Sequence, residues 1–248
     1  MDTLFTGKVV KHFKVATSTN ELAAEALKRS KVIEGSAFRA DSQTEGKGQR
    51  GRVWNSNAGQ NILASYIFYP QFLKSDEQFN LIKAVSLAVK DLLDKYLIDK
   101  ASIKWPNDIY INDSKIAGIL VESTMKGNYM SSSIIGIGLN VNQRKFGDLS
   151  NATSVVLETG KGCSLDMLFN ELSFHLEKRY LQLKQNKNAA DKAYSKAMYR
   201  LGEESLYWIN NQKVELTLIG VDVLGRLLLE DKNGNQSAFA MHEVKQII

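Results

Sequence analysis

Apolar and polar positions along the chain follow two different spacings. Between Gln78 and Leu97, and again between Leu165 and Leu183, apolar residues recur every three or four positions, which predicts two long helices. Strong helix formers from Glu21 to Arg29 predict a third helix, and the spacing over 189–199 predicts a fourth. Short runs rich in β-branched and aromatic residues predict strands at 8–15, 36–41, 61–69, 103–105, 108–111, 115–124 and 129–142.

These elements predict how one large domain is built. The run from Asn61 to Tyr69 is almost continuously apolar, so we expect it near the centre of a sheet. Turn residues at Asn112-Asp113 and at Lys126-Gly127-Asn128 predict hairpins between the strands that they join. Residues 143–153 are polar and predict an irregular loop. We therefore predict an α+β fold, in which a mixed or antiparallel central sheet is backed by the long helices.

The spacing changes again near the C-terminus. From Leu206 onward apolar residues alternate with polar ones, and turn residues occur at Asn210-Asn211, Gly225 and Asn233-Gly234. Short strands with tight turns predict a small β-barrel. We expect a larger domain over residues 1–202 and the small barrel over residues 203–248.

Composition excludes several classes of protein. The chain is 44% hydrophobic and 24% charged, with a formal net charge of +5, which is typical of an ordinary globular protein and too mild to indicate DNA binding. The single cysteine, Cys163, excludes an internal disulfide, and the three histidines lack the spacing of metal ligands. We find no signal peptide and no membrane-spanning run, so we expect a cytoplasmic protein without a membrane partner.

A glycine-rich basic stretch lies between two predicted strands. Three glycines permit unusual backbone angles and close approach of backbone N–H groups to a ligand, and three cations beside them suit a phosphate or carboxylate. A solvated basic loop is the alternative for such a stretch taken alone. The residues are Gly46, Lys47, Gly48, Gln49, Arg50, Gly51 and Arg52.

Other candidate residues follow later in the chain. Lys104 ends a strand just before Pro106, where it could neutralise charge on a phosphate or simply extend into solvent. Lys115 could approach the same side. Glycines inside strands (Gly118, Gly136 and Gly138) indicate either a ligand lying flat on the sheet or a β-bulge. Asn140 could hydrogen-bond a nitrogen heterocycle, whereas helix capping alone explains Ser18-Thr19-Asn20.

Taken together, these segments resemble the biotin–protein ligases (biotin–[acetyl-CoA-carboxylase] ligases). They occur in that family's order and separations from about residue 8 to 160, and the segment after Glu203 resembles, with less specificity, the family's SH3-like domain. The resemblance implies a catalytic domain like that of class II synthetases. Because the chain starts at this domain, we expect a ligase without the DNA-binding segment of the ligase–repressors. The matching segments are Ser18-Thr-Asn20, Gln43, Gly46–Arg52 with Trp54, Lys104-Trp-Pro-Asn-Asp108, Lys115–Gly118 and Gly136–Asn142.

The resemblance also implies a reaction and roles for residues. Biotin's carboxylate would attack the α-phosphate of ATP, in complex with Mg²⁺, and biotin would pass from biotinyl-5′-AMP to a lysine of a biotin carboxyl carrier protein domain. Lys104 and Arg50 would be catalytic, and Asp108 is a residue to test as a magnesium ligand. Biotin would contact Ser18, Thr19, Asn20, Gln43, Gly46, Lys47, Gly48, Gln49, Trp54, Lys104, Gly118 and Gly136. The nucleotide would contact Lys47, Gln49, Arg50, Gly51, Arg52, Lys104, Asn107, Lys115, Gly138, Asn140 and Phe146.

The glycine-rich stretch departs from the family pattern at two positions. Lys47 and Gln49 stand where arginines are common in the family, so the grip on the adenylate would be weaker. We therefore expect more release of free biotinyl-AMP than from a Gln49→Arg variant.

Three alternatives remain at this point. A lipoate ligase or octanoyl transferase shares the fold, although Cys163 is poorly placed as a nucleophile. A nucleic-acid-binding protein could use the basic stretch, although the C-terminal segment has mixed charge. A domain without such a site would require these motifs to coincide by chance. The sequence does not decide the acceptor protein, or whether a homodimer forms through an edge of the sheet.

Overall fold

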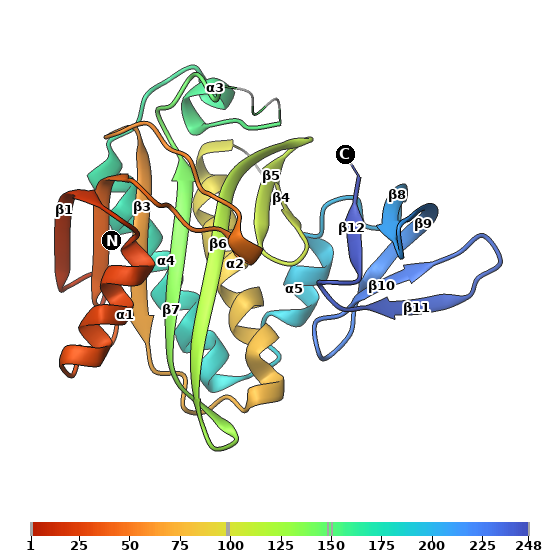
Figure 1. The fold of residues 1–248 in the computed structure, drawn as a ribbon, viewed down its shortest axis with the longest axis horizontal. Coiled ribbons are helices and arrows are strands. Elements are labelled where there is room, and N and C mark those ends of the chain that lie inside the picture. The colour runs from red at the N-terminus through yellow and green to blue at the C-terminus, as the bar shows by residue number, and fades with distance from the viewer. Residues whose placement is uncertain (1, 98–99, 148, 150, 248) are drawn as a thin grey trace.

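The structure is a computed structural model and describes residues 2–97, 100–147, 149 and 151–247. The side chain of Arg50 lies outside this description. Figure 1 shows a large sheet with its helices and, beside them, a smaller sheet formed by the C-terminal residues.

The large sheet has seven strands in the order β1-β2-β3-β7-β6-β5-β4. β1 and β2 are parallel, and every other neighbouring pair is antiparallel, which confirms the predicted mixed sheet. All eight residues of β3 are buried, as its continuous apolar sequence predicts for an inner strand. The strands are β1 (Val10–Ala16), β2 (Ala37–Gln43), β3 (Asn61–Phe68), β4 (Ala101–Lys104), β5 (Asp108–Ile111), β6 (Ser114–Lys126) and β7 (Tyr129–Asn140).

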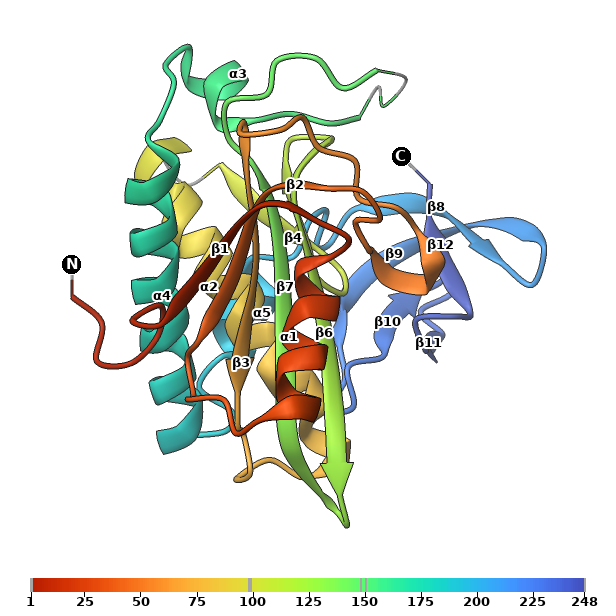
Figure 2. The ribbon, with the colours of Figure 1, turned by 60° about the vertical axis from the view of Figure 1, so that its left-hand side comes forward.

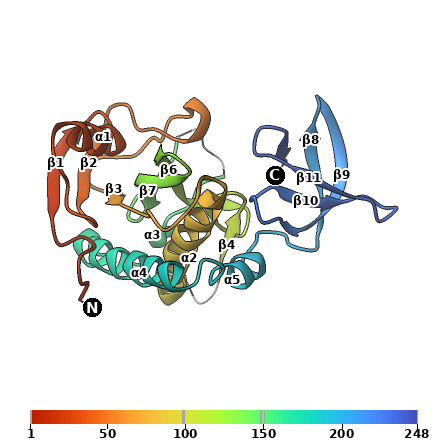
Figure 3. The ribbon, with the colours of Figure 1, turned by 90° about the horizontal axis from the view of Figure 1, so that it is seen from below.

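Helices cover both faces of the large sheet. The predicted long helices α2 (Gln78–Leu97) and α4 (Leu165–Gln185) lie on one face, where their apolar residues form the main core with the sheet. α1 (Thr19–Arg29) lies on the opposite face, and its Ala23 packs on Phe38, Ile67 and Ile134 in a smaller cluster (Figures 2 and 3). Because α1 covers only part of its face, the rest is open to other residues.

Both predicted hairpins are confirmed, with positive φ at Asn112 and Gly127. The predicted helix 189–199 is too long: α5 spans only Asp191–Lys196. Its last predicted turn instead pairs with β4, because Ile103 N donates to the Ala197 carbonyl and Tyr199 N donates to the Ile103 carbonyl. A short helix that was not predicted, α3 (Val155–Thr159), begins at Ser154, whose hydroxyl accepts from Leu157 N.

The C-terminal residues form an antiparallel sheet of five strands in the order β11-β10-β9-β8-β12, consistent with an SH3-like domain. Within the described residues β11 and β12 are not paired with each other, so the strands of the predicted small barrel form an open sheet there. Tyr207 and Leu218 of this sheet belong to the same buried cluster as the large sheet. The strands are β8 (Glu204–Ile209), β9 (Gln212–Val221), β10 (Leu227–Glu230), β11 (Gln236–Phe239) and β12 (Val244–Gln246).

None of the helices in the described part of the chain has the length and hydrophobicity needed to cross a lipid bilayer.

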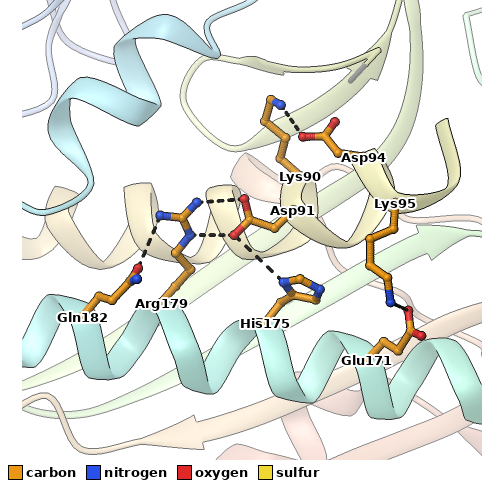
Figure 4. Close-up of polar contacts among 8 residues, drawn as sticks. All are labelled: Lys90, Asp91, Asp94, Lys95, Glu171, His175, Arg179 and Gln182. Carbon is orange, nitrogen blue, oxygen red and sulfur yellow. Dashed lines mark hydrogen bonds and ion pairs between the residues drawn. The ribbon is translucent and has the colours of Figure 1, made fainter. Parts of the chain in front are cut away.

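Polar side chains join α2 to α4 across the edge of the main core (Figure 4). The Arg179 guanidinium binds both carboxylate oxygens of Asp91 at 2.7 and 2.8 Å, and Lys95 lies 2.9 Å from Glu171. His175 lies between these pairs, with its Nδ1 4.0 Å from Asp91, and neither ring nitrogen has a hydrogen-bond partner among the described residues. Burial lowers the pKa of His175 below its ordinary value of 6.5, although Asp91 opposes this effect.

This lowered pKa predicts that acidification destabilises the fold. As the pH falls below 6.5, the unfolded chain takes up a proton at His175 before the folded chain does, so the free energy of unfolding decreases. We expect His175→Gln to lose less stability than the parent between about pH 7.5 and about pH 5.5 in urea titrations. The matched control is His242→Gln at an exposed histidine, which should keep the parental pH dependence. An unchanged dependence in His175→Gln would contradict this account.

Candidate active site

Two glycines that face each other on adjacent strands create a bare strip on the α1 side of the large sheet. Gly118 of β6 and Gly138 of β7 are direct partners in the antiparallel register. The Trp54 indole lies on this strip: a Cβ at Gly118 would come within 2.8 Å of its ring, and one at Gly138 would overlap it. The register is regular at both positions, so the alternative of a β-bulge is wrong. Trp54 lies close to both glycines, and contact of a ligand with them stays a prediction.

Trp54 ends the glycine-rich stretch, which forms a short hairpin. Trp54 N donates to the Gly46 carbonyl at 2.8 Å, and Gly48 N donates to the Arg52 carbonyl at 2.7 Å. Gly51, with a φ of +74°, closes the turn in a conformation that glycine adopts without strain. A Cβ at Gly46 would overlap the Trp54 carbonyl oxygen. The glycines therefore shape a compact hairpin whose end is fixed by Trp54.

A network of neutral polar groups lies beneath this hairpin. The Gln43 side-chain oxygen accepts from Thr19 N at 2.7 Å and from the Thr19 hydroxyl at 3.1 Å. The Ser65 hydroxyl donates to Asn20 Oδ1 at 2.5 Å and lies 2.7 Å from the Thr19 hydroxyl. A Cβ at Gly136 would overlap Asn20, so this glycine makes room for the asparagine side chain. The network holds amide and hydroxyl groups in fixed orientations, which suits recognition of a planar polar ligand.

Ser18 occupies the N-cap position of α1, as predicted, but its side chain makes no capping hydrogen bond. Capping therefore does not account for its hydroxyl, which lines the pocket between α1 and the hairpin. We call this space the inner pocket. Most residues predicted to contact biotin line it: Ser18, Thr19, Asn20, Gln43, Lys47, Gly48, Gln49, Trp54, Gly118 and Gly136. Arg52, Lys115 and Gly138, predicted for the nucleotide, line it as well.

A second space, the outer pocket, shares Trp54 with the inner pocket. Its walls include Trp54, Lys115, Asn140, Phe146 and Leu149. Asn140 is buried, and its amide donates to the Thr153 carbonyl at 3.0 Å, so it also anchors the segment that carries Phe146. Trp54 and Lys115 belong to both pockets and thus form the wall between them.

Lys104 lines neither pocket. It faces a third space, the intersheet cleft, which also has Arg52 of the hairpin and residues of the C-terminal sheet in its walls. Burial lowers the pKa of the Lys104 ammonium to about 8; Asp108 opposes this shift, whereas Lys115 and Arg52 add to it. Its Nζ lies 5.4 Å from the centre of the Tyr110 ring. A half-buried lysine with a lowered pKa among other cations is typical of a site that binds an anion.

Two of the predicted phosphate-binding cations already have carboxylate partners. Lys47 lies 2.5 Å from Glu21 of α1, and this pair raises the pKa of the lysine. Lys115 lies 2.7 Å from Asp108 and 5.5 Å from the centre of the Trp54 ring. Asp108 is thus engaged by a lysine, and the described residues contain no group of three or more His, Cys, Asp or Glu that could hold a metal ion.

Some predicted site residues are not brought to these spaces. Asn107 is buried and donates to the Ile119 carbonyl, so it supports the β5–β6 hairpin. Gly46 and Gly51 shape the glycine-rich hairpin without lining a pocket, and the side chain of Arg50 lies outside the described residues.

Three residues of the site, Ser65, Glu21 and Glu122, were not predicted from the sequence. Ser65 could have been predicted, because it is the only serine or threonine in the otherwise largely apolar strand β3. Glu122 accepts from the Asn20 amide at 2.6 Å, and Glu21 pairs with Lys47. No local pattern marks these two carboxylates, because their partners are far away in the sequence.

The contact between Trp54 and Gly138 predicts a specific coupling. Gly138→Ala should destabilise the protein by about 1–3 kcal/mol, because the new methyl group overlaps the indole. In a Trp54→Leu background the same substitution should cost much less, and urea unfolding of the four proteins measures the difference. An equal loss of unfolding free energy in both backgrounds would show that the contact with the indole does not explain why position 138 is a glycine.

Comparisons with known proteins agree with this architecture. A model of the "Biotin/lipoate A/B protein ligase family" matches residues 12–140. The bifunctional ligase/repressor BirA of Bacillus spizizenii is 37% identical over 171 residues, which cover 67% of this chain and 52% of that protein. The biotin–[acetyl-CoA-carboxylase] ligase of Paracoccus denitrificans is 36% identical over 125 residues, 50% of this chain and 52% of that protein. The chain spans about half the length of the curated relatives it matches.

Among solved structures, a biotin protein ligase from Aquifex aeolicus in complex with biotin and ATP is similar along almost the whole chain. The TM-score is 0.81 at 26% identity, and the match covers 97% of this chain and 99% of that one. The family match extends over more than half of the 248 residues and includes the glycine-rich hairpin, the bare strip and Lys104. The chain therefore belongs to the biotin/lipoate A/B protein ligase family.

Proposed function

We propose that this protein is an ATP-dependent biotin–protein ligase, which activates biotin as biotinyl-5′-AMP and transfers biotin to a lysine of a biotin carboxyl carrier protein domain. The observation that carries the proposal is the pair of adjoining pockets that share the Trp54 wall, with Lys104 and Arg52 beside them. One pocket offers fixed neutral polar groups, the other offers aromatic and amide groups, and the cations lie next to both. That combination suits a polar uncharged ring, a nucleotide base and the charged groups between them.

The inner pocket supports biotin as the acid. The amide and hydroxyl groups of Thr19, Asn20 and Gln43 can donate to and accept from a ureido ring, whereas the chain of an aliphatic acid has no polar atoms with which they could pair. Trp54 and Ile119 would contact the apolar part of the ligand. The same chemistry weighs against octanoate as the substrate.

The cations support the activation step. The carboxylate oxygen of the acid attacks the α-phosphorus of ATP, the bond to the β-phosphate breaks, and pyrophosphate leaves with the bonding electrons. Lys104 and Arg52 would neutralise the charge that builds up on the phosphate oxygens in a half-buried site. The described residues contain no group of three or more His, Cys, Asp or Glu that could hold a metal ion, and we assign no step to the metal.

The small volume of the inner pocket indicates that the hairpin opens before a ligand binds. The inner pocket has a volume of about 120 Å³, below the ~300–1,000 Å³ usual for ligand sites. A ligand therefore requires the hairpin that covers the pocket to move. The contact of Lys47 with Glu21 across the pocket is an exposed ion pair, which opposes this movement only weakly.

Transfer requires that an acceptor domain dock near the site. β1 is at the edge of the large sheet, and most of its residues are exposed. Such an edge can pair with a strand of the acceptor domain or of a second copy of the chain. The acceptor's identity, homodimer formation, a cytoplasmic location and the division into domains at residues 202 and 203 stay predictions. So does easier release of the adenylate because of Gln49.

The test is ATP–pyrophosphate exchange with biotin, lipoate or octanoate as the only added acid. We expect exchange with biotin alone, and a loss of at least about 100-fold in Lys104→Ala. Lys196→Ala, at an exposed lysine of α5, is the matched control and should retain exchange. Exchange that prefers lipoate would assign the protein to another branch of the family. No exchange with any of the acids, from folded protein, would contradict the proposal.

A further inference from the structure

Glu122 is an exposed carboxylate on β6 that binds a residue of the inner pocket without lining the pocket itself. Its Oε2 accepts a hydrogen bond from the Asn20 side-chain amide at 2.6 Å, and Asn20 is buried and lines the pocket. The proposed function gives Glu122 no role. A carboxylate that touches a site only through an asparagine can act on a ligand by fixing how that asparagine is oriented.

The register of the large sheet explains why Glu122 and Asn20 meet. Glu122 is paired with Ile134 of β7, and Gly136, two residues further along β7, shares the same face. On the other side of β7, Ser65 of β3 is paired with Gly136. Because Gly136 has no side chain, the Asn20 side chain lies over it. Ser65 and Glu122 are then the two partners of the amide, one on each strand that flanks β7.

The Glu122 carboxylate decides which way round the Asn20 amide lies. A carboxylate can only accept hydrogen bonds, so the amide must present its NH₂ group to Glu122 and its oxygen to Ser65. In the opposite orientation the amide oxygen would meet the carboxylate, and the two would repel each other. The Ser65 hydroxyl tolerates either orientation, because a hydroxyl both donates and accepts. Glu122 is therefore the group that fixes the Asn20 oxygen over Gly136, which lines the inner pocket.

The other end of the same network is also fixed by a group that has only one role. The Thr19 backbone N–H can only donate, so the Gln43 oxygen must face it, and the Thr19 hydroxyl donates to that same oxygen. Ser65 then has one proton for two acceptors, the Thr19 hydroxyl oxygen and the Asn20 amide oxygen. One of these two oxygens receives no proton from Ser65 and can accept from an N–H group of a ligand.

We propose that Glu122 is a positioning residue that gives the inner pocket its preference for a ligand with N–H donors. It holds the Asn20 oxygen where such a donor can bind, and it turns away the amide NH₂ group, which cannot accept from that donor. A cyclic urea has N–H donors, whereas the dithiolane ring of lipoate has none. The inference rests on the proposed function and adds to it a specificity residue that lies outside the pocket wall.

The test measures binding of biotin by calorimetry, without ATP. Glu122→Gln should bind biotin roughly tenfold more weakly than the parent, because a glutamine can also donate and so permits the opposite orientation of the Asn20 amide. The matched control is Glu45→Gln. Glu45 is exposed and lines no part of the inner pocket, and its charge, like that of Glu122, adds to the effect of Glu21 in raising the pKa of Lys47. This control should bind biotin like the parent.

A double-mutant cycle separates the orientation of the amide from a general effect of the charge. In an Asn20→Ala background, Glu122→Gln should change the affinity for biotin by less than about twofold, because no amide remains to be oriented. Glu122 is exposed, and thermal unfolding without ligand should show that Glu122→Gln folds like the parent.

Four results would overturn the inference. These are no binding of biotin by the parent, unchanged affinity in Glu122→Gln, an equal loss in Glu45→Gln, or the same loss from Glu122→Gln when Asn20 is already alanine. Because the measurements use no ATP, they still test the inference if biotin binds but the exchange assay finds no activation. Exchange with biotin together with unchanged affinity in Glu122→Gln would overturn the inference alone. Its failure and the failure of the proposed function can therefore be told apart.

Discussion

The Trp54 indole lying on Gly118 and Gly138 is the contact on which the site depends. Gly118 and Gly138 are paired across β6 and β7, and because neither has a side chain, the aromatic ring can lie directly on the backbone of the sheet. The ring fixes the end of the glycine-rich hairpin, and the hairpin covers the inner pocket. The same ring is a wall of the outer pocket. A single apolar contact therefore sets the position of two binding pockets at once.

Charge is distributed unevenly around that contact. Lys47 and Lys115 each have a carboxylate partner, Glu21 and Asp108, so their charges are balanced in this conformation. Lys104, by contrast, is half-buried. Burial lowers its pKa to about 8, the cations Lys115, Arg52 and Lys245 add to this shift, and Asp108 opposes it. The exposed Lys47–Glu21 pair opposes movement of the hairpin only weakly, whereas Lys104 is the group suited to meet a phosphate. The C-terminal sheet contributes to this imbalance through its docking on β4 and α2.

The sequence predicted the strands and long helices well, because hydrophobic spacing reports directly which face of each element is buried. It also identified Thr19, Asn20 and Gln43, which lie together as expected. It could show that Gly118 and Gly138 needed a close neighbour, but not that the neighbour is Trp54, since that contact depends on how the hairpin folds back. Glu21 and Glu122 were not found for the same reason: each pairs with a residue that only the tertiary structure brings near. Helix 189–199 was predicted too long because pairing with β4 outweighed local helix propensity.

We infer that Trp54 separates an acid-binding pocket from a nucleotide-binding pocket. The most direct measurement is a crystal structure with biotin and a non-hydrolysable ATP analogue bound together. The account predicts the biotin ring within hydrogen-bond distance of Thr19, Asn20 and Gln43, the adenine on the opposite side of Trp54, and the indole still on Gly118 and Gly138. Both ligands on one side of the ring, or an indole displaced from the glycine strip, would contradict it.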